Sequence, residues 1–190
     1  MATVSATLEL GAVAPAFELT DVVSGRAVGR DDVVGTEPRG LLVFFVCVHC
    51  PYVKHVEAEI ARIGRDYADK VGIVAISSND IVAYPQDAPT EMKKQAEAQG
   101  WNFPYLYDET QEVAREYGAV CTPDVFLFDK EMALVYRGQF DDSRPRRKDK
   151  GNDLPVTGKD LRAALDAVVR GEQPSADQKA SIGCSIKWRA

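Results

Sequence analysis

The sequence has few cysteines and no long apolar run, and both absences exclude classes of protein. Four cysteines among 190 residues are too few for the disulfide scaffold of a small secreted domain. No stretch approaches the roughly 18 apolar residues that a membrane-spanning helix needs. The first ten residues lack the basic and apolar segments of a secretory signal peptide. We therefore expect a cytoplasmic protein with no membrane partner.

Basic residues are also fewer than acidic ones: the sequence has 23 Lys and Arg and 29 Asp and Glu, which gives a formal net charge of −6. A chain with this balance has no electrostatic reason to bind nucleic acid. Its length and its ordinary share of apolar residues suit one globular domain. We predict a single domain over residues 1–190, with residues 172–190 as a C-terminal tail packed on its body. The sequence does not indicate an oligomeric state.

Apolar periodicity predicts a strand, a helix and a second strand in the first half of the chain. Leu41–Val46 is a continuous β-branched and aromatic run, typical of a strand that is buried on both faces. After Pro51, apolar residues at helical spacing continue to Tyr67. Val71–Ile76 is the second short apolar run. Together these segments predict a right-handed βαβ unit with parallel strands.

The second half of the chain is predicted to complete the sheet and to add helices. Glycine, proline and polar residues separate its apolar segments from one another. The predicted elements are helices over residues 90–99 and 109–117, a hairpin of residues 125–128 and 134–137, and a last helix that begins at a capping box of Thr157 and Asp160 and ends before Gly171.

The most informative segment is Cys47-Val48-His49-Cys50, where the first predicted strand meets the first helix. Two cysteines at this spacing can close a small disulfide ring, and the free N–H groups and dipole of a helix N-terminus stabilise a thiolate. We predict that both cysteines lie in the first helical turn. Cys47 is expected to attack as the nucleophile, and the more shielded Cys50 is expected to resolve the mixed disulfide.

His49 lies between the two cysteines and has two possible roles. If it donates a hydrogen bond or a positive charge to the Cys47 sulfur, it lowers the pKa of that thiol and raises the reduction potential. The alternative is an exposed residue without an electronic role. A structural zinc site needs four ligands, usually in two close pairs, and Cys121 and Cys184 form no second pair. We expect no metal and no cofactor.

Several segments, in this order, resemble a known family. Gly11–Leu19 resembles the opening of peroxiredoxins and of thioredoxin-like proteins of the cytochrome-maturation type, and the dithiol and the stretch Tyr117–Pro123 follow it. The chain is similar to peroxiredoxin-like redoxins of the AhpC/TSA type with a thioredoxin-type C-x-x-C dithiol. The resemblance implies an α/β protein with a thioredoxin-like fold. It would have a central mixed sheet flanked by helices, an N-terminal extension and a peroxiredoxin or cytochrome-maturation type of insertion.

The resemblance also implies supporting residues. In this superfamily the proline that matches Pro123 is cis and lies beside the dithiol, and the backbone of the residue that matches Thr122 pairs with an incoming peptide strand. The chain departs from peroxiredoxins at Phe44, where they have a threonine, and at the position of their arginine near the site. These departures disfavour peroxide activation. The strand before Cys47 also lacks the buried carboxylate of thioredoxin, which leaves the proton acceptor for Cys50 unidentified.

Two further cysteines are candidate redox thiols. Cys121 lies two residues before the predicted cis-proline, so it is either a third redox thiol or a small buried hydrophobe. Cys184 lies in a C-terminal segment with apolar residues, and it is a candidate resolving cysteine for Cys47.

We predict a thiol–disulfide oxidoreductase that exchanges disulfides with protein partners through Cys47 and Cys50. A thioredoxin-type protein or glutathione is its expected reductant. One alternative is a thiol-dependent peroxidase with antioxidant activity, in which Cys47 reacts with peroxide and Cys50 resolves the product. Another alternative is a non-enzymatic redox sensor whose C-terminal segment moves. The sequence does not indicate the direction of electron flow.

Overall fold

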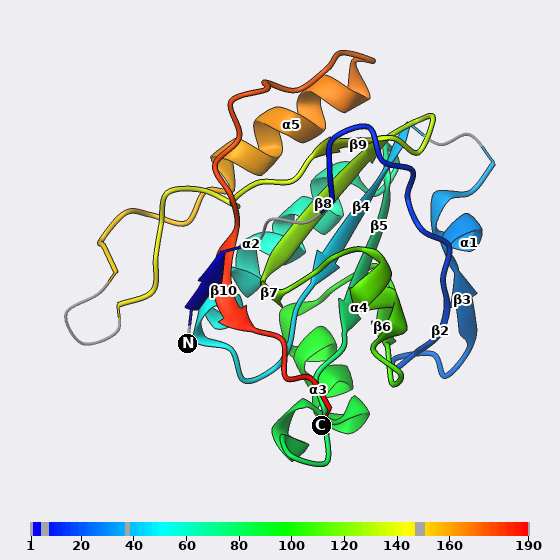
Figure 1. Cartoon of the computed structure of the whole chain (residues 1–190), viewed down its shortest axis with the longest axis vertical. Coiled ribbons are helices and arrows are strands. Elements are labelled where there is room, and N and C mark those ends of the chain that lie inside the picture. The colour runs from blue at the N-terminus through cyan, green and yellow to red at the C-terminus, as the bar shows by residue number, and fades with distance from the viewer. Residues whose placement is uncertain (1, 5–7, 37–38, 147–150, 190) are drawn as a thin grey trace.

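The structure is a computed structural model that describes residues 2–4, 8–36, 39–146 and 151–189. A mixed sheet of seven strands forms its centre (Figure 1). Its strands are β2 (Glu18–Asp21), β3 (Ala27–Gly29), β4 (Gly40–Phe45), β5 (Gly72–Ser77), β6 (Tyr105–Tyr107), β8 (Asp124–Asp129) and β9 (Leu134–Tyr136). Their order across the sheet is β3-β2-β6-β5-β4-β8-β9, so β4 lies inside the sheet and its end is surrounded by other elements.

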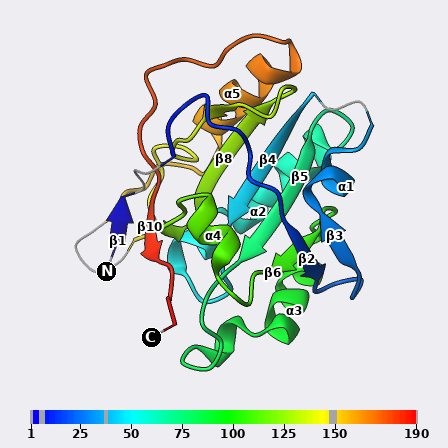
Figure 2. The same ribbon diagram turned by 45° about the vertical axis from the view of Figure 1, so that its right-hand side comes forward.

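A second sheet of three strands joins segments from distant parts of the chain. It consists of β1 (Ala2–Val4), β7 (Cys121–Thr122) and β10 (Ile182–Ser185), with β10 in the middle. Both pairings are antiparallel. The blue β1 and the red β10 lie side by side in Figures 1 and 2.

Helices cover both faces of the seven-stranded sheet. They are α1 (Arg30–Val34), α2 (Pro51–Tyr67), α3 (Pro89–Gln99), α4 (Glu112–Glu116) and α5 (Lys159–Val169), with a 3-10 turn η1 (Pro85–Asp87) before α3. The fold is therefore a mixed α/β fold with a central mixed sheet flanked by helices, as predicted. Among the described residues, no helix is long and apolar enough to cross a membrane.

The strand β4 shows how the two faces of the sheet are filled. Every residue of β4 is buried, and its side chains alternate between two apolar clusters because successive strand residues face opposite sides. Leu42 and Phe44 pack in the cluster with α2, α3 and α5, whereas Val43 and Phe45 pack in the cluster with α4. α2 and α4 accordingly lie on opposite faces in Figure 2. Each such buried side chain contributes about 1.5–3 kcal/mol.

The predicted βαβ unit is confirmed. β4 and β5 are parallel neighbours, and α2 connects them. α2 begins at Pro51, whose missing N–H costs little in the first helical position, and it ends at Tyr67 as predicted. The helix predicted over residues 90–99 is α3, and Gly100 ends it in a left-handed conformation with φ of 65°.

Two helix starts differ from the prediction. α4 is shorter than the predicted residues 109–117, because Gln111 has a positive φ of 64° and the Asp108 carboxylate accepts the N–H of Ala114. The predicted capping box of the last helix is wrong, because Gly158 is the N-cap of α5. The buried Asp141 carboxylate, from the same connection between β9 and α5, accepts the N–H groups of residues 157 and 158 instead.

Candidate redox site

The dithiol lies where β4 ends and α2 begins, close to the middle of the sheet. Cys50 is the N-cap of α2, and Cys47 precedes it in the connecting loop. The prediction that both cysteines lie in the first helical turn is therefore wrong for Cys47. The exposed fractions of Cys47 and Cys50 are 1% and 0%. Both are thiols, and each is closed off from solvent in this conformation.

Thr122 contacts both sulfurs of the dithiol. The Thr122-Pro123 peptide bond is cis, in agreement with the resemblance. The Thr122 hydroxyl lies 3.3 Å from the Cys47 Sγ, and the Cys50 thiol donates to the Thr122 carbonyl oxygen at 3.1 Å. The structure thus brings together the cysteines and the Thr-Pro pair that the sequence singled out, although the contacting residues are 72 to 75 positions apart in the sequence.

A buried carboxylate that the sequence analysis missed holds the dithiol loop. Asp87, at the end of η1, is fully buried. Its Oδ1 accepts the backbone N–H groups of Val48 and His49 at 2.9 and 3.0 Å. Its Oδ2 accepts from the Asn79 side-chain amide at 2.8 Å. No motif in the sequence connects Asp87 with Cys47, because the two meet through the packing of distant loops.

The ring of His49 has a different partner from the one we predicted. Its Nδ1 lies 2.5 Å from the Asp87 Oδ2, and its ring stacks on Tyr84 with centroids 5.7 Å apart and an interplanar angle of 8°. The hydrogen bond expected between His49 and the Cys47 sulfur is thus replaced by one to Asp87. His49 is therefore connected with the dithiol loop through Asp87, which also accepts the backbone N–H groups of Val48 and His49.

The surroundings of the two sulfurs favour opposite protonation states, in the reverse of the predicted order. A hydrogen bond with Cys50, burial and the negative charge of Asp87 raise the pKa of the Cys47 thiol. Hydrogen bonds with Cys184 and Cys47, and one with the backbone of Val53 in the first turn of α2, lower the pKa of Cys50. Cys50 is the N-cap of α2, so the helix N-terminus acts on this cysteine more directly than on Cys47.

The other two cysteines have contrasting environments. Cys121 is fully buried, and its thiol donates weakly to the Pro123 carbonyl at 3.7 Å. Burial and the charge of Asp124 raise the pKa of Cys121, which fits the interpretation as a small buried hydrophobe. Cys184 is half-buried on β10 and packs against the apolar cluster that contains the dithiol, where it lowers the pKa of Cys50.

The strand β10 covers the backbone edge beside the dithiol. Its Cys184 lies opposite Thr122, and its Ser185 lies opposite Cys121. The resemblance implied that an incoming peptide pairs with Thr122 at this edge. In this conformation that expectation is wrong, because the chain's own C-terminal strand occupies the position.

Cys47, His49 and Asp87 also form a group whose candidate ligand atoms all lie within 4.8 Å of one another. Metal binding by such a group requires a carboxylate oxygen that can turn to the ion. Both oxygens of Asp87 already accept hydrogen bonds from the loop and from Asn79. We therefore interpret the group as a hydrogen-bond network.

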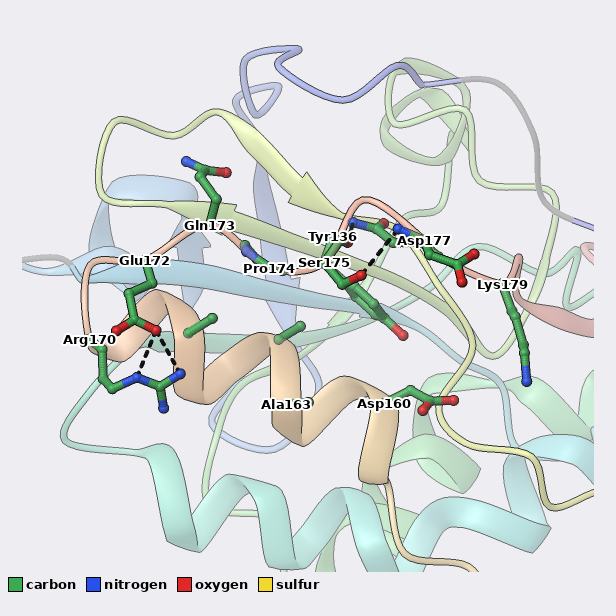
Figure 3. Close-up of a pocket in the computed structure, with 13 residues that line it drawn as sticks. Tyr136, Asp160, Ala163, Arg170, Glu172, Gln173, Pro174, Ser175, Asp177 and Lys179 are labelled. Carbon is green, nitrogen blue, oxygen red and sulfur yellow. Dashed lines mark hydrogen bonds and ion pairs between the residues drawn. The ribbon is translucent and has the colours of Figure 1, made fainter.

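A hollow of about 360 Å³ lies away from the dithiol, between α5 and the segment that follows it (Figure 3). Arg170 and Glu172 form an ion pair at 2.8 Å on its wall. Its lining contains no cysteine. We therefore assign the candidate redox chemistry to the dithiol and not to this hollow.

Comparisons with known proteins identify the family of the chain. Residues 10–137 match the AhpC/TSA family. An uncharacterised conserved protein from Geobacillus kaustophilus is 51% identical, with a TM-score of 0.93 over 100% of this chain and 97% of that one. A hypothetical protein from Sinorhizobium meliloti 1021 is 43% identical, with a TM-score of 0.92 over 99% of each chain.

A more distant similarity concerns the fold alone. The thioredoxin domain of a thiol-disulfide oxidoreductase from Bacteroides vulgatus is 24% identical, with a TM-score of 0.56 over 69% of this chain and 89% of that one. A search of curated protein sequences finds no match. The central sheet and helices are thus those of thioredoxin-like proteins.

Proposed function

The chain belongs to the AhpC/TSA family, and on this premise we propose that it is a thiol–disulfide oxidoreductase that acts through Cys47 and Cys50. The observation that carries the proposal is that Thr122 contacts both sulfurs at the N-terminus of α2. Two thiols held together in this way can alternate between a dithiol and a disulfide. The proposed substrates are protein disulfides, and the proposed reductant is a thioredoxin-type protein or glutathione.

The proposed reaction has two exchange steps. Cys47 attacks one sulfur of a partner disulfide, forms a mixed disulfide and releases the first partner sulfur as a thiolate. Cys50 then attacks the Cys47 sulfur, so the Cys47–Cys50 bond forms as the mixed disulfide breaks. Two electrons pass to the partner, and the two protons lost by the cysteines go to its released sulfurs. The same steps in reverse oxidise a partner dithiol.

Asp87 is the proposed proton acceptor and positioning residue for these steps. It is a buried carboxylate with an oxygen within 4.8 Å of the Cys47 sulfur, a gap that one bridging water can span. Its bonds to the N–H groups of Val48 and His49 also fix the loop that carries Cys47. The role proposed for Asp87 concerns Cys47, and the proton acceptor for Cys50 stays open.

The test is a disulfide-reduction assay with insulin or glutathione disulfide as substrate. We expect Cys47→Ser and Cys50→Ser to lose turnover, and Cys50→Ser to accumulate a mixed disulfide with the substrate. Cys121→Ala is the matched control, because it removes a nearby thiol whose weak hydrogen bond is to the Pro123 carbonyl. A Cys47→Ser variant that turns over at the wild-type rate would refute the proposal.

A second candidate is a thiol-dependent peroxidase, and the burial of Cys47 favours it. A site whose nucleophile is only 1% exposed admits a small peroxide more readily than a folded protein. In that reaction the Cys47 thiolate attacks the O–O bond, which gives a sulfenic acid and releases water once the leaving oxygen is protonated. Cys50 then condenses with the sulfenic acid, with loss of a second water, to form the disulfide.

Stopped-flow kinetics separates the two candidates. The reduced protein is mixed with hydrogen peroxide or with a protein disulfide, and the fluorescence of Trp101 and Trp188 is followed. Fast reaction with the disulfide alone supports the oxidoreductase. Fast reaction with peroxide alone supports the peroxidase.

A further inference from the structure

Cys47 and Cys50 are closed off from solvent, whereas Cys184 is partly exposed. Cys47 and Cys50 are at most 1% exposed, and β10 covers the edge beside them. Of the chain's four cysteines, Cys184 is the one that is not fully buried. Any exchange between the buried pair and a large partner must therefore move β10 or pass through a thiol that lies nearer to solvent.

The register of the small sheet turns Cys184 towards the dithiol. Cys184 lies directly opposite Thr122, and residues opposite each other in an antiparallel pair project their side chains to the same side. The Thr122 hydroxyl is in contact with the Cys47 sulfur. On that same side, Cys184 packs against the apolar cluster that contains Cys47 and Cys50.

The close approach of β10 depends on a glycine. A Cβ atom on Gly183 would lie 2.1 Å from the Thr122 carbonyl oxygen, a distance that no side chain could tolerate. Beyond β10, Ile186 is 3% exposed and donates its N–H to the Val120 carbonyl at 3.0 Å. Lys187 donates its N–H to the Asn79 side chain at 2.8 Å. These contacts fix the segment that carries Cys184 on both sides of the cysteine.

We propose that Cys184 is a third redox thiol. It forms a disulfide with Cys50 in place of Cys47, and so transfers the disulfide of the buried pair to a thiol that partners at the surface can reach. This rests on the proposed function, because the Cys47–Cys50 disulfide must form first. The Cys184 thiolate attacks the Cys50 sulfur, the Cys50–Cys184 bond forms, and the Cys47–Cys50 bond breaks. Cys47 leaves as a thiolate and takes up the proton that Cys184 lost, so one disulfide remains and no oxidant is consumed.

The Cys50–Cys184 disulfide is then the species that a partner dithiol reduces. One partner thiolate attacks the Cys184 sulfur and releases Cys50, and the second partner thiolate attacks the resulting mixed disulfide and releases Cys184. The partner leaves oxidised by two electrons, and all three thiols are restored. The proposed partner class is a protein dithiol, because a substrate with two thiols completes both steps within one encounter.

A trapping experiment tests the pairing directly. Full-length Cys47→Ser protein is oxidised with diamide, which accepts two electrons and two protons from a pair of thiols, and the product is mapped by mass spectrometry without reduction. We expect an intramolecular Cys50–Cys184 disulfide and the loss of two titratable thiols per chain. Cys184→Ser combined with Cys47→Ser is the matched control and should lose this product. If Cys184 stays a thiol, or pairs only between chains, the inference is wrong.

Turnover of the Cys184→Ser single variant separates this inference from the proposed function. We expect it to form the Cys47–Cys50 disulfide as the wild type does, but to lose the fast reduction of that disulfide by a protein dithiol such as thioredoxin. Wild-type rates in Cys184→Ser would overturn the role of Cys184 and leave the proposed function intact. A wild-type protein that forms no Cys47–Cys50 disulfide would instead refute the proposed function.

Discussion

The two sheets of this protein are built in different ways. The seven-stranded sheet contains the long strands β4 and β8, which are buried except at Asp129, and its apolar clusters fill both faces. The three-stranded sheet joins residues 2–4, 121–122 and 182–185, which are short segments from three distant parts of the chain. The large sheet supplies the stability of the molecule, whereas the small sheet places Thr122 and Cys184 beside the dithiol. Stability and candidate chemistry are therefore separable by mutation.

The largest expected effect comes from the large sheet. Phe126 in β8 is fully buried, and its ring lies 5.7 Å from that of Phe45 and 5.8 Å from that of Tyr117. Phe126→Ala should lower the free energy of unfolding by about 3–5 kcal/mol, because it removes the ring and leaves a cavity. Urea denaturation measures the change. The control is Val82→Ala at a position that is 85% exposed.

The control should change the free energy of unfolding by no more than about 0.5 kcal/mol. A loss of less than about 1 kcal/mol in Phe126→Ala would show that the large sheet does not dominate stability, and the comparison between the sheets would fail.

Asp87→Asn should have the next largest effect, and it acts on the loop between the two sheets. The new amide keeps an oxygen for the N–H groups of Val48 and His49, but it places a donor against the Asn79 amide. We expect a loss of about 1–3 kcal/mol for the unsatisfied buried donors. Because the Asp87 charge raises the pKa of Cys47, its removal lowers that pKa.

The measurement for Asp87→Asn is the pH profile of Cys47 alkylation, resolved by peptide mass spectrometry. The profile should shift to lower pH, since more thiolate is present at each pH. Asp69→Asn, at an exposed position, should leave the profile in place. A shift to higher pH in Asp87→Asn would contradict the proposed electrostatic effect of the carboxylate.

The elements of the large sheet were predictable because their signals are local. The spacing of apolar residues and Pro51 predict the bounds of α2. The spacing of Cys47 and Cys50 identifies the dithiol. The directions of the two pKa shifts were not predictable, because they depend on contacts between the cysteines, on burial and on Asp87, which packs against them from a distant loop. Asp87 and Cys184 reach the site through tertiary packing, which leaves no spacing pattern in the sequence.

The strand β10 illustrates the same limit. Its sequence Ile-Gly-Cys-Ser lacks an alternating pattern, and glycine weakens an isolated strand. Gly183 is nevertheless the residue that allows β10 to approach the Thr122 carbonyl. The residue that weakens an isolated strand is thus the one that makes this pairing possible.

Gly183→Ala tests the small sheet while it keeps every thiol. We expect a cost of about 1–3 kcal/mol from the overlap with the Thr122 carbonyl, relieved by movement of β10 away from β7. Alkylation of Cys47 and Cys50 should become faster, and oxidation should give less Cys50–Cys184 disulfide. Ser185→Ala in the same strand is the control, because its backbone pairing is unchanged. Unchanged alkylation in Gly183→Ala would show that β10 does not limit access to the dithiol.

Thr122→Val should have the smallest effect on stability. It should shift the pH profile of Cys47 alkylation in the direction opposite to the shift in Asp87→Asn. The substitution keeps the shape of the side chain and the carbonyl that accepts from Cys50, but it removes the hydroxyl at 3.3 Å from the Cys47 sulfur. The cost should be about 0.5–1.5 kcal/mol for one hydrogen bond. Because the hydroxyl lowers the pKa of Cys47, its loss raises that pKa and shifts the alkylation profile to higher pH. Thr20→Val, at an exposed position of β2, should not shift the profile. Shifts of Thr122→Val and Asp87→Asn in the same direction would mean that local charge and hydrogen bonding do not set the reactivity of Cys47.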